Sequence, residues 1–215
     1  MKIINLSEQN SIINQYMAEI RDKEYQKNRL LFRNNIKRIG QYEAFEISKT
    51  LDYEAREIAT PLGISTVNVP TDKMVLATIF RAGLPFHEGF LEVFDHAGNA
   101  FVSAYREYED AEHHKVGIHV EYLATPSIDE KNLIIADPML ATGGSACAAL
   151  SMLKKHGCKH IRLLDIIAAP EGIARVQREH PDVDIYVCSV DEKLNDHGYI
   201  IPGLGDAGDR IFGTK

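Results

Sequence analysis

The spacing of apolar residues in the first part of the chain (1–50) predicts helices. Apolar side chains recur every three or four positions across Ile12–Ile20, which places them on one face of a helix. We expect Ser7 or Asn10 to cap this helix, because both side chains accept hydrogen bonds from free backbone amides. A second helix is predicted from about 27 to 48. Gly40 weakens its middle, since glycine is a poor helix former.

The second half of the chain alternates between apolar runs and amphipathic stretches, after a turn marked by Pro61 and Gly63. The apolar runs have the length and composition of buried strands, and the amphipathic stretches have helical spacing. The predicted strands are Met74–Phe80, Asn132–Ala136, Ile161–Ala169 and Asp184–Val190, and the predicted helices are Ser145–Lys155 and Glu171–Glu179. This order implies right-handed crossovers and predicts an α/β fold with a parallel sheet covered by helices on both faces.

The loop after the second of these strands has the composition of a phosphate site. Its sequence is Asp137-Pro138-Met139-Leu140-Ala141-Thr142-Gly143-Gly144-Ser145. Ligands of parallel sheets bind beyond the carboxyl ends of the strands, and free amides at a helix start bind anions. A capped helix after a flexible turn explains Thr-Gly-Gly alone. Asp137 favours a sugar-phosphate site, because its carboxylate suits ring hydroxyl groups or a metal ion. The signatures of a P-loop and of a dinucleotide-binding loop are both missing from the sequence.

Composition and charge exclude several classes of protein. The chain has 215 residues, 24 Lys and Arg against 31 Asp and Glu, and a formal charge of −7, which gives no footprint of a nucleic-acid binder. No apolar run approaches the roughly 20 residues that span a bilayer, and the first ten residues lack a signal-peptide pattern. Three cysteines without Cys-x-x-Cys spacing predict neither disulfides nor a zinc site. We therefore expect a cytoplasmic protein with no membrane partner.

Four segments carry a resemblance to a known family. The Asp137–Ser145 loop resembles the phosphoribosyl diphosphate (PRPP) loop of phosphoribosyltransferases, in the wording of the uracil phosphoribosyltransferase branch. Arg81-Ala82-Gly83-Leu84 resembles a second loop of that branch, and Gly198–Gly213 resembles its uracil-binding segment almost without change. Ala168–Gly172 also matches, without a ligand role. The resemblance implies a single phosphoribosyltransferase-like (Rossmann-like) domain over 1–215, with a helical N-terminus, an arm at 104–128 and a uracil-binding segment at 198–215.

The resemblance also implies which residues bind the substrates. The residues implied for PRPP are Arg81, Arg106, Asp206 and the loop Asp137, Pro138, Met139, Leu140, Ala141, Thr142, Gly143, Gly144 and Ser145. Those implied for uracil are Ile200, Gly205, Asp206 and Ala207, acting largely through backbone groups. Arg81 and Asp206 are the implied catalytic residues, and Asp209 and Arg210 are expected to hold the loop. Arginine suits diphosphate because its planar fork matches phosphate oxygens.

The implied reaction is transfer of phosphoribosyl from PRPP to N1 of uracil, which gives UMP and diphosphate. Mg²⁺ is the implied cofactor, held mainly through the diphosphate with no metal ligand assigned directly. No residue is assigned as a general base. The family resemblance further implies a homodimer or higher oligomer and names GTP as a candidate allosteric effector, without locating its site.

The arm departs from the family pattern, which leaves the alignment of Arg106 open. Its His113, His114 and His119 lack a recognised zinc spacing, so we interpret them as solvated. Cys147 lies where a helix start can acidify a thiol, although a small buried side chain is the preferred interpretation.

Two rival functions stay open at this point. One is a phosphoribosyltransferase for a different base. The other is a regulatory protein that binds PRPP with little or no turnover.

Overall fold

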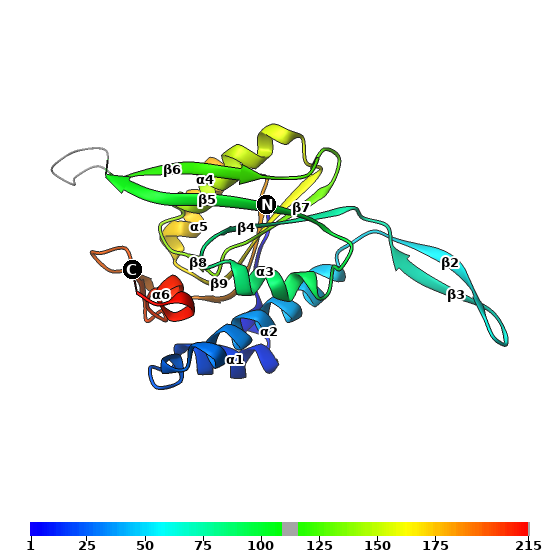
Figure 1. Cartoon of the computed structure of the whole chain (residues 1–215), viewed down its shortest axis with the longest axis horizontal. Helices are drawn as coiled ribbons and strands as arrows, with labels where there is room; N and C mark the ends of the chain where they lie inside the picture. Colours follow the sequence, from blue (N-terminus) through cyan, green and yellow to red (C-terminus); the bar gives the residue numbers. More distant parts are fainter. Residues whose placement is uncertain (109–115, 215) are drawn as a thin grey trace.

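The computed structural model describes residues 1–108 and 116–214, with backbone alone at 104–108 and 116–121. Eight strands form its central sheet: β1 (Ile3–Asn5), β4 (Met74–Phe80), β5 (Gly98–Tyr108), β6 (Val116–Ala124), β7 (Asn132–Ala136), β8 (Met139–Leu140), β9 (His160–Ala168) and β10 (Asp184–Val190). They lie in the order β1-β10-β9-β7-β4-β5-β6, with β8 beside β9 (Figure 1). Every pair is parallel except β5 with β6. The predicted parallel α/β sheet is confirmed.

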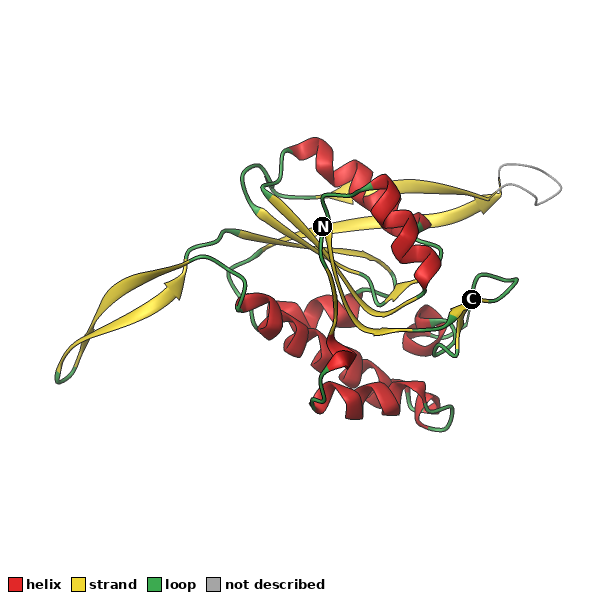
Figure 2. Cartoon of the chain, turned by 180° about the vertical axis from the view of Figure 1, so that it is seen from behind, coloured by secondary structure: helices red, strands yellow, loops and turns green. Residues whose placement is uncertain are grey.

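The helices form a layer on each face of this sheet (Figure 2). They are α1 (Ile12–Arg21), α2 (Arg29–Ser48), α3 (Leu84–Leu91), α4 (Gly144–Leu153), α5 (Pro170–Glu179) and α6 (Ala207–Phe212). One buried apolar cluster joins α1, α2, α3 and α6 to the sheet. A second cluster joins α4 and α5 to the opposite face. In the described part of the chain, no helix is long and apolar enough to cross a membrane.

The predicted helices and strands are confirmed with small shifts at their ends. Ser11 caps α1 by accepting a hydrogen bond from the amide of Ile13, so the prediction of Ser7 or Asn10 as the cap is wrong. Asn28 caps α2 in the same way. The helix continues through Gly40, where it packs directly against α3, because tertiary contacts outweigh the low helix propensity of glycine.

Two hairpins complete the fold. Strands β2 (Tyr53–Thr60) and β3 (Gly63–Pro70) pair only with each other in the described structure and project from the body of the molecule (Figure 1). The turn expected at Pro61 and Gly63 is the tip of this hairpin. Strands β5 and β6 form the second hairpin, so the arm predicted at 104–128 begins inside a strand of the central sheet. Two short strands, β11 (Lys193–Leu194) and β12 (Ile200–Ile201), pair near the C-terminus.

The core beneath the sheet contains carboxyl groups that lack full hydrogen bonding. Asp165 on β9 is fully buried, and neither of its carboxylate oxygens has a partner in the described structure. Glu43 on α2 is 1% exposed and accepts a hydrogen bond at 2.7 Å from the Cys188 thiol, while its other oxygen is unpaired among the described residues. Burial, together with the neighbouring charges of Asp137 and Glu43, holds the pKa of Asp165 well above its usual range. Asp165 therefore keeps its proton to a higher pH in the folded chain than in the unfolded chain.

Replacement of Asp165 with Asn is expected to stabilise the fold at neutral pH. The unfolded Asp is ionised above about pH 4, whereas the folded Asp holds its proton, so folding takes up a proton and stability falls as pH rises. Each pH unit within that window costs about 1.4 kcal/mol for one proton. Urea unfolding at pH 5 and pH 8 should therefore show an advantage of Asp165→Asn that grows with pH.

Asp182 provides the control of opposite sign. Its exposed carboxylate pairs with Lys154, and this hydrogen bond lowers the pKa of Asp182. Asp182→Asn should show no gain in stability at pH 8. An advantage of Asp165→Asn that is equal at both pH values would contradict the raised pKa of Asp165.

Candidate active site

The phosphate loop leaves the sheet at the end of β7 and enters α4. Its path is fixed at the start by the amide of Asp137, which donates to the carbonyl of Leu164 at 3.0 Å. It is fixed at the end by Gly143, the residue that caps α4, with a left-handed φ of 75°. A Cβ at Gly143 would also lie 3.0 Å from the carbonyl oxygen of Gly172. Glycine is therefore required here, both for the turn and for the contact with α5.

That contact gives Ala168–Gly172 a structural role. The amide of Ala169 donates to the carbonyl of Leu140 at 2.9 Å, and Gly172 packs against the backbone of the same loop. The segment to which no ligand role was assigned thus supports the phosphate loop from behind.

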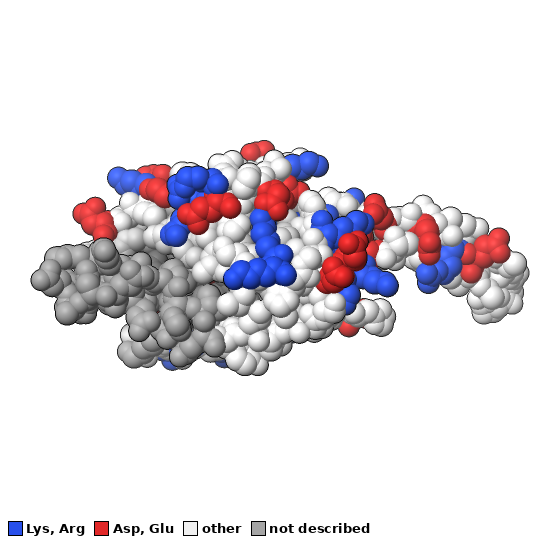
Figure 3. Space-filling view, turned by 90° about the horizontal axis from the view of Figure 1, so that it is seen from above, with Lys and Arg blue, Asp and Glu red and all other residues white. Residues whose placement is uncertain are grey.

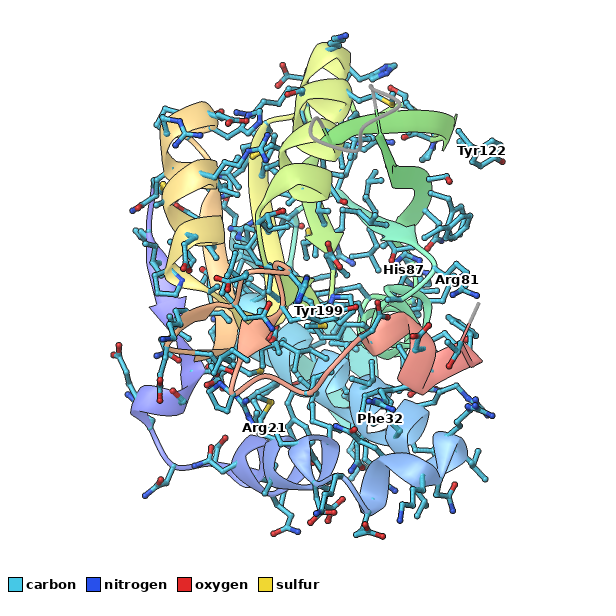
Figure 4. The ribbon with its side chains drawn as sticks, turned by 90° about the vertical axis from the view of Figure 1, so that its left-hand side faces the viewer. Arg21, Phe32, Arg81, His87, Tyr122 and Tyr199 are labelled. Atoms are coloured by element: carbon cyan, nitrogen blue, oxygen red, sulfur yellow. The ribbon has the colours of Figure 1, made fainter. Side chains whose placement is uncertain are left out.

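The loop that carries Arg81 lies at the same edge of the sheet. It follows β4, the neighbour of β7, and parallel strands end on the same side. Gly83 allows the two loops to approach, because a Cβ there would lie 2.0 Å from Oγ1 of Thr78 and 2.9 Å from the carbonyl oxygen of Ala136. The guanidinium of Arg81 (labelled in Figure 4) lies 5.8 Å from the ring centroid of Phe212, a cation–π contact that orients it.

These loops enclose a cleft of about 400 Å³. The polar side chains at its wall belong to Arg81, Asp137, Thr142, Ser145, Asp206, Asp209 and Thr214. Among the described lining residues, three are acidic and one is a cation. A polyanion bound here needs additional positive charge, because carboxylates repel it. Hard oxygen ligands of this type, together with phosphate oxygens, suit Mg²⁺.

A second cleft of about 320 Å³ adjoins the first. Its wall includes His197, Gly198, Tyr199, Gly205 and Ala207 from the C-terminal segment. The two clefts share six lining residues, which are Ala82, Asp137, Met139, Ala141, Asp206 and Gly208. They are continuous, so one ligand of nucleotide shape can occupy both.

The structure brings most of the predicted site residues to these clefts. Asp137 and the loop from Met139 to Ser145 line the first, Pro138 lines the second, and Gly205 and Ala207 also line the second. Ile200 is 3% exposed, belongs to the apolar core and is not among the described lining residues. Arg106 lies on β5, and its side chain is outside the described part of the structure.

The C-terminal segment holds Asp206 between the two clefts. Its Oδ1 accepts a hydrogen bond at 2.9 Å from the amide of Asp209 and so caps α6. The guanidinium of Arg210 packs against Gly205, as expected for a residue that holds the loop. Asp209, expected to be structural, also lines the first cleft. No role was predicted for Tyr199 or Phe212, because their positions depend on how the C-terminal segment folds back.

Asp137 is the titrating group at the centre of the site. Burial raises its pKa to about 7, against the opposing effect of a hydrogen bond from the amide of Met139. Its carboxyl therefore changes charge near neutral pH. The ionised form accepts hydrogen bonds from sugar hydroxyl groups.

Other titratable groups do not form a metal site in the described structure. Cys147, Glu179 and His180 place their ligand atoms within 4.8 Å of one another. Arg175 and Arg178 already bind Glu179, and burial together with Glu179 raises the pKa of Cys147 to about 12. A cation does not fit there, and Cys147 is the buried side chain expected. His113 and His114 lie outside the described residues, and the side chain of His119 is also outside the description.

Comparisons with known proteins agree with this geometry. The family model described as uracil phosphoribosyltransferase matches residues 7–214. A curated relative from Porphyromonas gingivalis, named uracil phosphoribosyltransferase, is 48% identical over 217 residues and covers 100% of both chains. The solved AQ2163 protein from Aquifex aeolicus is 35% identical, with a TM-score of 0.89 over 99% of both chains. A hypoxanthine phosphoribosyltransferase from Staphylococcus aureus, 16% identical with a TM-score of 0.50 over 74% of both chains, shares the fold.

The match spans nearly the whole chain and includes every segment that forms the two clefts, from the Arg81 loop to the C-terminus. By its sequence and its fold, this chain belongs to the uracil phosphoribosyltransferase family.

Proposed function

We propose that the chain transfers the phosphoribosyl group of PRPP to uracil and forms UMP and diphosphate, a step of pyrimidine salvage. The observation that carries this proposal is the continuity of the two clefts through Asp137 and Asp206. One cleft offers a phosphate loop, and the other offers the backbone of a glycine-rich segment. Curated relatives that match the full chain bear the name of this enzyme, so a regulatory protein without turnover is not favoured.

The proposed binding of PRPP follows from the groups that line the first cleft. The amides and hydroxyls of Thr142–Ser145 bind the 5-phosphate at the start of α4, where the helix dipole favours an anion. Asp137 accepts hydrogen bonds from the ribose hydroxyls. Arg81 and Asp206 face the diphosphate, and Arg106 is proposed as a second cation from the family resemblance. Mg²⁺ would be held mainly by the diphosphate, with Asp206 nearby, and would supply positive charge to the leaving group.

The proposed recognition of uracil uses the second cleft. Gly205, Asp206 and Ala207 line it and offer fixed backbone groups, and Ile200 is retained from the family resemblance. Uracil presents alternating acceptors and donors along one edge, so cytosine would leave a buried group unpaired. N1 of uracil then attacks the anomeric carbon of PRPP while diphosphate leaves. Holding both substrates in line and neutralising the diphosphate supply the catalysis.

Steady-state assays of UMP formation test the proposed activity. With PRPP and Mg²⁺, we expect turnover of uracil and at least about a hundredfold lower kcat/KM for cytosine and hypoxanthine, since a mispaired buried group is heavily penalised. Removal of Mg²⁺ with a chelator should abolish turnover. GTP is proposed as an effector from the family resemblance, and its addition to the assay tests that. Tight PRPP binding without turnover of uracil would instead favour the regulatory role.

The proposed role of Asp137 predicts a specific pH dependence. Protonation removes the negative charge of Asp137 and turns one of its acceptor oxygens into a donor, which weakens the hydrogen bonds from the ribose hydroxyls. For this reason, kcat/KM for PRPP should fall as pH drops below about 7. Asp137→Asn should lower kcat/KM by about a hundredfold and remove this acidic limb. If the titrating group belonged to PRPP, the fall in kcat/KM at acidic pH would persist in the variant. An Asp137→Asn profile that parallels the wild type would therefore contradict the assignment.

We propose a homodimer in which the β2–β3 hairpin contacts the second copy. Nearly every residue of the hairpin is exposed, including Ile58, Leu62, Ile64 and Val67, at 40%, 100%, 72% and 45%. An isolated two-stranded hairpin is marginally stable in water, so a partner that covers it is favoured. In Figure 3 the projecting hairpin carries both acidic and basic side chains. One such pair joins Arg56 to Glu54.

Light scattering coupled to gel filtration tests the dimer. The wild type should have about twice the chain mass of 24.1 kDa. Ile58→Asp combined with Val67→Asp, at two positions that the strand register places on one face of the hairpin, should yield the monomer. Thr66→Asp combined with Asn68→Asp adds the same charge at polar positions of the hairpin and should leave the dimer intact. A wild-type monomer, or equal effects of both pairs, would contradict the role of the hairpin.

A further inference from the structure

The C-terminal segment is attached to the N-terminal helices by a buried ion pair. Arg21, at the end of α1, donates from its two terminal nitrogens to the two carboxylate oxygens of Asp191, at 2.8 Å and 2.6 Å. The side chain of Asp191 is 3% exposed, and that of Arg21 is 24% exposed. Although burial opposes ionisation, the hydrogen bonds from Arg21 and Gly203 lower the pKa of Asp191. The pair is thus ionised, and its two-point geometry fixes its orientation.

This ion pair holds one peptide unit on each side of Gly203. Arg21 Nη1 donates to the carbonyl oxygen of Gly203 at 3.0 Å, and Oδ2 of Asp191 accepts the amide of Gly203 at 2.8 Å. Figure 4 shows Arg21 between α1 and the C-terminal segment. Gly203 lies only two residues before Gly205, which lines the second cleft. A shift of the backbone at Gly203 therefore moves the groups proposed to bind uracil.

Two further side chains anchor the same segment from the N-terminal helices. Gln26, 9% exposed, donates to the carbonyl oxygen of Leu204 at 2.9 Å and to that of Ile20 at 2.7 Å. Arg33 donates to the carbonyl oxygen of Ile211 at 2.9 Å. Neither these side chains nor the ion pair line the described clefts. Their contacts instead hold the backbone of Gly203, Leu204 and Ile211, on either side of the residues that line the clefts.

We propose that Arg21 and Asp191, assisted by Gln26, are positioning residues for base recognition, which they serve by fixing the peptide groups of Gly203 and Leu204. The inference rests on the proposed uracil site. Recognition by backbone groups requires a rigid backbone, because a change of side-chain rotamer cannot bring a displaced amide or carbonyl back into place. The phosphate loop is held by different contacts, from Ala169 and Gly172. Changes at Arg21 or Gln26 should therefore weaken the binding of uracil and leave the binding of PRPP nearly unchanged.

Kinetics of Arg21→Lys test the proposal. Lysine keeps the charge beside Asp191 but lacks the planar fork that binds both the carboxylate and the carbonyl of Gly203. We expect KM for uracil to rise about tenfold, with KM for PRPP within about twofold and kcat little changed, as for loss of one positioned hydrogen bond. The preference for uracil over cytosine should fall. Arg178→Lys, which alters an exposed arginine paired with Glu179, is the matched control.

A second variant keeps the test valid if Arg21→Lys does not fold. Gln26→Met preserves the length of the side chain and removes its donor to Leu204, and it should also raise KM for uracil selectively. Equal increases in both KM values, no change in KM for uracil, or failure of both variants to fold would overturn the positioning role. The wild type in the same assay distinguishes failure of the proposed function from failure of the positioning role. If it does not turn over uracil, the proposed function fails, whereas normal wild-type turnover with an unchanged KM in the variants contradicts only this inference.

Discussion

The parallel pairing of β4 with β7 is the constraint on which the site depends. Its register places Thr78 beside Ala136, so the Arg81 loop and the phosphate loop leave the sheet at the same level. The hydroxyl of Thr78 reinforces this by donating to the carbonyl of Ala136 at 3.1 Å. Displacing one strand by a residue would reverse the faces of its side chains and separate the guanidinium of Arg81 from the loop that is proposed to bind phosphate. The register of β4 and β7 therefore determines how the Arg81 loop and the phosphate loop lie relative to each other.

The C-terminal segment completes the site at this edge of the sheet. Its helix α6 belongs to the layer of α1, α2 and α3, whereas α4 belongs to the other layer. The segment has little regular structure of its own, and its conformation is imposed by Arg21, Gln26 and Arg33 on the N-terminal helices. The helical N-terminus thus does more than cover the sheet. Because its side chains hold the C-terminal segment, the shape of the second cleft depends on the stability of α1 and α2.

Local patterns in the sequence were enough to predict the parallel α/β core and the phosphate loop. Hydrophobic periodicity and glycine content can be read from residues that are adjacent in the sequence. Features that depend on distant contacts were not predicted. Strand β1 has only three residues and forms by pairing with β10. The ion pair of Arg21 with Asp191 joins residues 170 positions apart. The burial of Asp165 was not predicted because it is decided by tertiary packing, and the projecting β2–β3 hairpin has no buried face to create a pattern.

A crystal structure of the protein with bound UMP tests the central claim, that the two clefts form one nucleotide site. The account predicts the 5′-phosphate against the amides of Thr142–Ser145, the ribose hydroxyls beside Asp137 and the uracil ring against Gly205–Ala207. A uracil ring outside the second cleft, or a phosphate away from the loop at the start of α4, would contradict it.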